Sequence, residues 1–182
     1  MIIAHLPAGY VASRLLFNRF RPHAASFRRF LHAGLLGSVA PDLDMLYFHL
    51  IDHRQHHHHT LWPHFPILWA GLLLASLIRF HTGRARERAA LAVIFAANGL
   101  LHMVLDTVVG NIWWLAPFVD KPFSFFSVPA RYNPWWLNFI LHWTFILELA
   151  IVAWAIYLVR RSPDAPQAGA TPEPASRPAA WR

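Results

Sequence analysis

The clearest chemical signal in the sequence is a histidine and a carboxylate four residues apart, His102 and Asp106, within the apolar stretch LLHMVLDTV. Residues at positions i and i+4 lie on the same face of a helix, so an imidazole nitrogen and a carboxylate oxygen can approach one ion. An isolated pair of this kind is more often a hydrogen-bonded pair inside a helix bundle. Other candidate ligands at the same depth in neighbouring segments favour the metal interpretation.

Two further carboxylates, Asp42 and Asp44, directly follow a break in the second apolar segment at Pro41. The proline restricts the residue before it and frees backbone groups, so both side chains can project from a broken helix toward a cation. Capping of the following helix by one of these carboxylates is the alternative. Two acids in an apolar segment repel each other unless a metal or protons balance them, and this favours ligation.

A histidine-rich connection, DHRQHHHHTLWPHF, follows the second apolar segment. Histidine tracts bind metals, but the six histidines of this run cannot all coordinate one centre, and we expect two or three of them to be solvated loop residues. The candidate ligands are His58, His59 and His64. Arg54 is a candidate for holding an anionic substrate.

Two more histidines lie inside apolar segments, His5 early in the first and His142 early in the fifth. An ionisable side chain at the centre of a membrane span costs about 2.5 to 3.5 kcal/mol, so each one suggests a function. His5 is therefore a candidate functional residue. The candidate catalytic groups are Arg54, Asp44 and His142, whereas Glu148 is expected to lie deeper as a buried, neutral, hydrogen-bonded carboxyl.

These residues are carried by five apolar segments, each near the roughly 20 residues that a helix needs to cross about 30 Å of hydrocarbon. The chain has 56% hydrophobic and only 14% charged residues, well below the roughly 25% charged residues of soluble domains. We therefore expect an all-α fold, a polytopic membrane bundle of about five spanning helices. The segments are 1–20, 30–51, 61–80, 89–109 and 136–159.

Arginine placement predicts the orientation of this bundle. Clusters of arginine follow the first, third and fifth segments, and the positive-inside rule then places the N-terminus outside and residue 161 inside. All candidate site residues fall in the outer half of the membrane under this topology. The connection 110–135 is expected to be an interfacial loop because it is bounded by the tryptophans of an aromatic belt, Trp113, Trp114, Trp135 and Trp136.

Composition also excludes several classes of protein. The net charge of +7 comes from arginine clusters beside apolar segments, so membrane orientation explains it without nucleic acid. The absence of cysteine excludes disulfides, thiolate metal sites and a cysteine nucleophile. Residues 162–182 are rich in proline and alanine and are expected to form a disordered cytoplasmic tail.

The ordered series of His5, Pro41-Asp42-x-Asp44, His53-Arg54 with the histidines after it, and His102-x3-Asp106-Thr107 resembles the YdjM-like membrane-bound metal-dependent hydrolases. These are also described as LexA-binding, inner-membrane-associated hydrolases. The resemblance covers residues 5 to 120, and the family pattern differs at Gln55, His57 and Val109, where it has Gly, Thr and Thr. It implies that a metal site is lined by one or two histidines of the tract together with His5, Asp42, Asp44, His102 and Asp106.

From the residues and the resemblance together, we expect residues 1–161 to form a membrane-embedded hydrolase-like domain of the bacterial inner membrane. Mixed His and Asp ligands suit zinc, with manganese as the alternative. Metal-activated water would attack an ester or phosphoester, including that of a membrane lipid, at the periplasmic face. A metal-ion or proton transporter and a metal-stabilised membrane scaffold remain the alternatives.

Overall fold

The computed structural model describes residues 1–23, 26–53, 58–83 and 85–161. Within these ranges the prediction of an all-α fold is confirmed, because the regular elements are helices and the one extended pairing is an isolated bridge between Ile112 and Phe123. The predicted tail 162–182 lies outside the described residues. The α-helices are α1 (His5–Phe20), α2 (Phe27–Val39), α3 (Asp44–Leu50), α4 (Pro66–His81), α5 (Arg86–Asp106), α6 (Trp136–Ile140) and α7 (Phe145–Arg160), with 3-10 turns η1 (Pro41–Leu43), η2 (His58–Thr60) and η3 (Trp62–His64).

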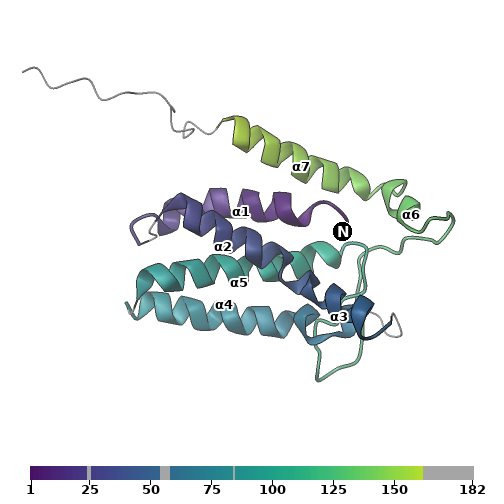
Figure 1. Cartoon of the computed structure of the whole chain (residues 1–182), viewed down its shortest axis with the longest axis horizontal. Helices are drawn as coiled ribbons and strands as arrows, with labels where there is room; N and C mark the ends of the chain where they lie inside the picture. The colour runs from purple at the N-terminus through teal and green to yellow at the C-terminus, as the bar shows by residue number, and fades with distance from the viewer. Residues whose placement is uncertain (24–25, 54–57, 84, 162–182) are drawn as a thin grey trace, which may run out of the picture.

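Helix α5 is the centre of the bundle. It packs against α1, α2 and α4, and α7 lies on the far side of α1 (Figure 1). The start of α1, the end of α5 and helix α3 meet at one end of the bundle (Figure 1). The arginine clusters at the ends of α1, α4 and α7 and the starts of α2 and α5 lie at the opposite end.

A single buried stripe of α5 changes its chemistry along the helix. Its members are spaced four residues apart, so they follow one face, and each is at most 4% exposed. The stripe begins in the apolar core near the arginine clusters and ends in titratable groups at the other end. In order it consists of Ala90, Ile94, Asn98, His102 and Asp106.

Asn98 joins three helices at the midpoint of this stripe. Its buried side-chain amide donates to the backbone carbonyls of Gly9 in α1 at 3.2 Å and Gly34 in α2 at 2.9 Å. It also donates to the hydroxyl of Ser13 at 3.2 Å. These bonds satisfy the buried NH₂ group of the side chain, which would otherwise be costly to bury, and they set the register of α1 and α2 against α5.

The second apolar segment breaks at the proline, as its sequence predicts. Helix α2 ends at Val39, and Pro41 opens the 3-10 turn η1 before Asp44 begins α3. Proline has no backbone N–H to continue the helical ladder, so the chain changes direction here. The turn brings Asp42 and Asp44 to the end of the bundle where α5 finishes.

The fifth apolar segment differs from the sequence expectation because it is not one helix. Residues 141–144 form a turn between α6 and α7. The Asn138 side chain accepts hydrogen bonds from the backbone of Arg131 and Tyr132 and so holds α6 against the preceding loop. His142 and Thr144 bond to each other across the turn, between Nδ1 and Oγ1 at 2.8 Å.

One helix of the described residues, α5, is long and apolar enough to cross a membrane, by length and composition. Helix α4 is apolar but shorter. Helices α1, α4 and α7 have 16 residues each, or about 24 Å at 1.5 Å per residue, which is less than the roughly 30 Å of a hydrocarbon core. These three helices are thus shorter than the apolar segments predicted for them.

Substitution of Gly37 in α2 can test how tightly this helix packs against α5. A Cβ atom added at Gly37 would meet the backbone oxygen of Phe95 at 2.1 Å, and backbone cannot move aside as a flexible side chain can. We expect Gly37→Ala to lower the free energy of unfolding by about 1 to 3 kcal/mol, because the two helices must separate. The thermal unfolding midpoint of the purified protein measures this.

Gly71 in α4 is the matched control, since a Cβ atom there meets nothing within 4 Å. Gly71→Ala should leave the midpoint unchanged or raise it slightly, because alanine is the better helix former. Equal midpoints for the two variants would contradict the close packing of α2 on α5.

Candidate metal centre

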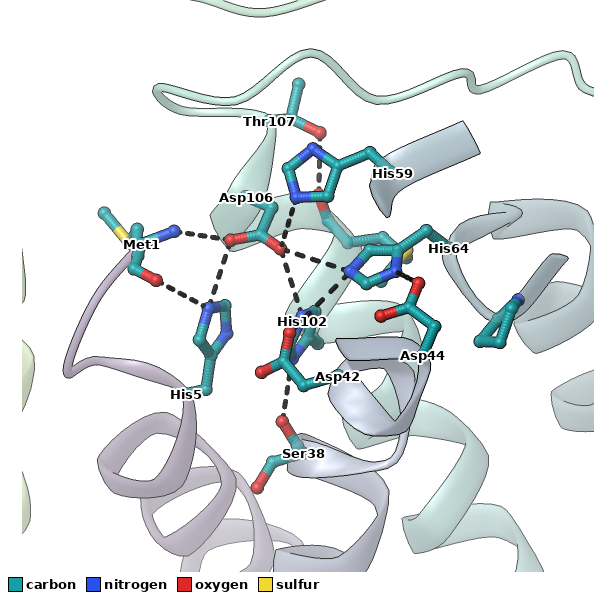
Figure 2. A network of polar contacts seen from close by, with 12 residues as sticks. Met1, His5, Ser38, Asp42, Asp44, His59, His64, His102, Asp106 and Thr107 are labelled. Atoms are coloured by element: carbon teal, nitrogen blue, oxygen red, sulfur yellow. Dashed lines mark hydrogen bonds and ion pairs between the residues drawn. The ribbon is translucent and has the colours of Figure 1, made fainter. Parts of the chain in front are cut away.

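Candidate ligands from five separate elements meet at the end of the bundle away from the arginine clusters (Figure 2). His5 begins α1, Asp42 lies in η1, and His59 and His64 come from η2 and η3. The last turn of α5 contributes the final two, His102 and Asp106. Apart from Asp42, each of these residues is at most 8% exposed.

The Asp106 carboxylate lies at the centre of the cluster (Figure 2). Its Oδ2 atom is 3.0 Å from Nε2 of His102, 3.7 Å from Nε2 of His59 and 3.8 Å from Nε2 of His64. Its Oδ1 atom faces a different partner, Nε2 of His5 at 3.1 Å. Ligand atoms around a tetrahedral zinc ion are separated by roughly 3.3 Å, so these separations suit a shared ion.

Three of the histidines are oriented in the same way, each by an oxygen behind the ring. Nδ1 of His59 donates to the Asn111 carbonyl at 3.0 Å, and Nδ1 of His102 donates to the Ser38 carbonyl at 2.8 Å. A carbonyl oxygen can only accept, so these rings carry a proton on Nδ1 and turn Nε2 toward the cluster. This is the arrangement typical of metal-binding histidines.

The third of these histidines, His64, is held by a carboxylate instead of a carbonyl. Its Nδ1 lies 2.6 Å from Oδ2 of Asp44, and both side chains are buried. Nε2 of His64 then faces Asp42 and Asp106, each at 3.8 Å. A carboxylate behind the ring makes the imidazole a stronger ligand.

The ligand atoms form three overlapping groups, in each of which all atoms lie within 4.8 Å of one another. Each pair of groups shares one residue, so the cluster can hold a metal ion and offers more than one position for it. The two oxygens of Asp106 face different neighbours, which suits a bridging carboxylate. The groups are His5, His102 and Asp106; Asp42, His64 and His102; and His59, His64 and Asp106.

Asp42 is the open side of the centre. Its side chain is 42% exposed, whereas that of Asp106 is 5% exposed and that of His64 is fully buried. The carboxylate of Asp42 still lies 3.5 Å from Nε2 of His102. Solvent therefore reaches the cluster at Asp42. The carboxylates of Asp42 and Asp106 both face Nε2 of His102, at 3.5 and 3.0 Å, and a cation bound there would offset their negative charges.

Four residues predicted for the site have other positions or lie outside the described side chains. Asp44, expected as a ligand and catalytic group, orients His64 and belongs to none of the three ligand groups. His142 bonds to Thr144 in the turn before α7 and belongs to none of them either. Arg54 and the side chain of His58 lie outside the described residues.

The first residues of the chain also reach the centre, which the sequence did not indicate. The amine of Met1 forms an ion pair with Oδ1 of Asp106, and the Met1 carbonyl lies 3.2 Å from Nε2 of His5. Glu148 accepts hydrogen bonds from the backbone of Ile2 and Ile3 at 2.9 and 2.6 Å. Glu148 therefore lies near this end of the bundle and not deeper, because α7 begins only at Phe145.

The chain was compared with models of protein families, with curated proteins and with solved structures, and none of them matches it. The candidate metal centre therefore depends on the geometry of this chain alone.

Removal of a central ligand should remove the metal. We expect His102→Ala to lower the metal bound per protein, measured by elemental analysis after purification without an affinity tag, by at least about tenfold. His142→Ala is the control because His142 bonds to Thr144 in the turn between α6 and α7, and it should bind metal as the unchanged protein does. Equal metal content in both variants would contradict the centre described here.

The role of Asp44 predicts a weaker effect. Asp44→Asn keeps a hydrogen-bond acceptor behind His64 but removes the negative charge, and loss of such a supporting group typically weakens metal affinity about 10- to 100-fold. Competition with a chelator of known affinity measures the change. A loss as complete as that of His102→Ala would show that Asp44 is itself a ligand.

Proposed function

We propose that this protein is a metal-dependent hydrolase of the bacterial inner membrane, similar to the YdjM-like family. The observation that carries the proposal is the common orientation of three histidines, whose Nε2 atoms surround one carboxylate oxygen of Asp106 at 3.0 to 3.8 Å. Each of these buried histidines is held by a hydrogen bond at Nδ1, so their Nε2 atoms point to one place. This favours a metal site over a network of hydrogen bonds alone. Zinc suits mixed nitrogen and oxygen ligands, and manganese is the alternative.

The arrangement of the residues supports a reaction and not only a structural role. A zinc ion bound here would lower the pKa of a coordinated water to about 7 and polarise an ester or phosphoester group. His59, His64 and His102 hold their orientation through bonds on the far side of each ring. Asp42, the exposed member, gives water and substrate access to the cluster and can accept a proton there.

A position in the membrane is supported by the surface and the charge distribution. Helix α7 exposes an apolar surface, and lipid would cover it. The arginine clusters at the helix ends lie opposite the candidate metal centre, and by the positive-inside rule this supports a centre at the periplasmic side of a bundle of about five spans. The exposed apolar residues of α7 include Ile146, Leu147, Leu149, Trp154, Ile156 and Val159.

The transporter alternative has less support. A pathway for ions needs ionisable groups across the whole bilayer. Among the described residues, the buried carboxylates and histidines lie at the end of the bundle where α5 finishes. They are His5, Asp44, His59, His64, His102, Asp106 and Glu148. A closed scaffold site is less well supported, because Asp42 leaves one side open.

Turnover of a panel of chromogenic carboxylic esters and phosphodiesters tests the proposal. We expect activity that disappears with a chelator and returns with zinc or manganese. Asp106→Asn should reduce this activity to that of the metal-free protein, because Asp106 contacts each of the surrounding histidines.

Glu87→Gln is the matched control, since Glu87 is an exposed carboxylate that pairs with Arg29 at the opposite end of the bundle. It should leave turnover unchanged. Bound metal without metal-dependent turnover on any substrate of the panel would argue against a hydrolase.

A further inference from the structure

A large apolar cavity adjoins the metal centre. It measures about 700 Å³ and lies between the η1–α3 region and α4. Its wall includes Leu43, Tyr47, Trp62, Leu68, Trp69 and Leu72. Cavities of this size, lined mainly by apolar and aromatic side chains with one or two polar groups, are typical of small-molecule sites.

The cavity is joined to the metal centre through one shared residue, Asp44. This carboxylate lines the cavity and bonds to the ligand His64 through Oδ2. Its other oxygen, Oδ1, is buried without a hydrogen-bond partner among the described residues. Asp44 is thus a polar residue in an otherwise apolar wall, and with one oxygen unsatisfied it is the place where a hydrogen-bond donor of a ligand would meet the cavity.

A second link runs through Trp69. Its indole lies in the cavity wall and donates to the Pro63 carbonyl at 2.7 Å, directly before His64. Trp62 lies at the surface of the same wall and is 68% exposed. The cavity wall therefore runs from Asp44 and Pro63, which contact or directly precede His64, to an exposed apolar surface.

We propose that this cavity holds a single hydrocarbon chain of the substrate while the polar head of the same molecule lies at the metal centre. The inference rests on the proposed function and narrows its substrate class to a long-chain amphiphile, such as a lipid with an ester or phosphoester group. The lining is apolar apart from Asp44 and Tyr47. It therefore offers many van der Waals contacts to a hydrocarbon chain and few hydrogen-bond partners to a polar substrate.

A second cavity supplies the comparison. It measures about 420 Å³, lies on the other face of α4 and is lined by Pro66, Ile67, Ala70 and Leu100 with four residues of the 114–119 loop. None of its lining residues is titratable, whereas the first cavity is lined by Asp44, which bonds to the candidate ligand His64. A hydrocarbon chain that binds to any apolar groove without selectivity would enter both cavities.

Single cysteines can report on occupancy because the natural chain has none. Leu72→Cys places a thiol in the first cavity, and Ile67→Cys places one in the second, on the same helix at similar exposure, 42% and 47%. Each zinc-loaded variant is treated with N-ethylmaleimide in detergent, with and without hexadecylphosphonate. Butylphosphonate is the control ligand, since it has the same head group and a chain too short to fill the cavity.

We expect hexadecylphosphonate at about ten times its Kd to slow the labelling of Leu72→Cys about tenfold. Butylphosphonate should not slow it, and Ile67→Cys should react equally fast under all conditions. Equal slowing of both variants would show partition into any apolar groove and overturn the inference. Labelling of Leu72→Cys that hexadecylphosphonate leaves unchanged would overturn it as well.

Turnover by the unchanged protein tests the proposed function separately from the hydrocarbon-chain site. Metal-dependent turnover with no protection of Leu72→Cys would leave the hydrolase in place and remove the chain site. Protection with no turnover on any ester or phosphoester would support the chain site and show that the protein binds an amphiphile without cleaving it.

Discussion

Burial of the Asp106 carboxylate is the constraint around which the chain is arranged. A buried charge is stable only with partners, and Asp106 has them from α1, η2, η3 and its own helix. These elements are far apart in sequence, and their contacts with Asp106 hold them together in the fold. A cation bound among them would add to the folding free energy, since the unfolded chain has no such site. Fold and centre are therefore coupled.

Helix α5 determines where the Asp106 carboxylate lies in the fold. Ile94 packs in the core cluster with Phe20 and Phe30, while the last turn carries the two ligands. Asn98, between them, fixes α1 and α2 by hydrogen bonds. A rotation of α5 would displace the apolar contacts, the amide and the ligands together. The four-residue spacing therefore links rigidity at one end of the helix to ligand geometry at the other.

The sequence predicted the α5 pair because its signal is local, a spacing of four inside one apolar helix. It also predicted the break at Pro41, where the missing N–H acts on the neighbouring residues alone. It could not distinguish Asp42 from Asp44. Both are carboxylates in the same turn, and only the packing of η3 against η1 decides which one faces the ligands and which one lies behind His64.

Other features depend on tertiary structure in the same way. The carbonyls of Ser38 and Asn111 orient two histidines, but every residue has a carbonyl, so no residue type indicates this role. The fifth apolar segment reads as one continuous span, yet Asn138 ties its first turns to the loop before it. Hydropathy measures the apolar character of such a segment and contains no information on this bond.

The indole of Trp69 couples two parts of the protein mechanically. Its ring rests on Gly99 of α5, where even a methyl group would lie 1.9 Å from a ring carbon, so the ring cannot retreat toward the helix. Its N–H holds the Pro63 carbonyl, next to His64. A molecule that displaced the ring from the cavity side would disturb its hydrogen bond to Pro63, in the 3-10 turn that carries His64. Filling of the cavity is in this way coupled to the position of the His64 imidazole.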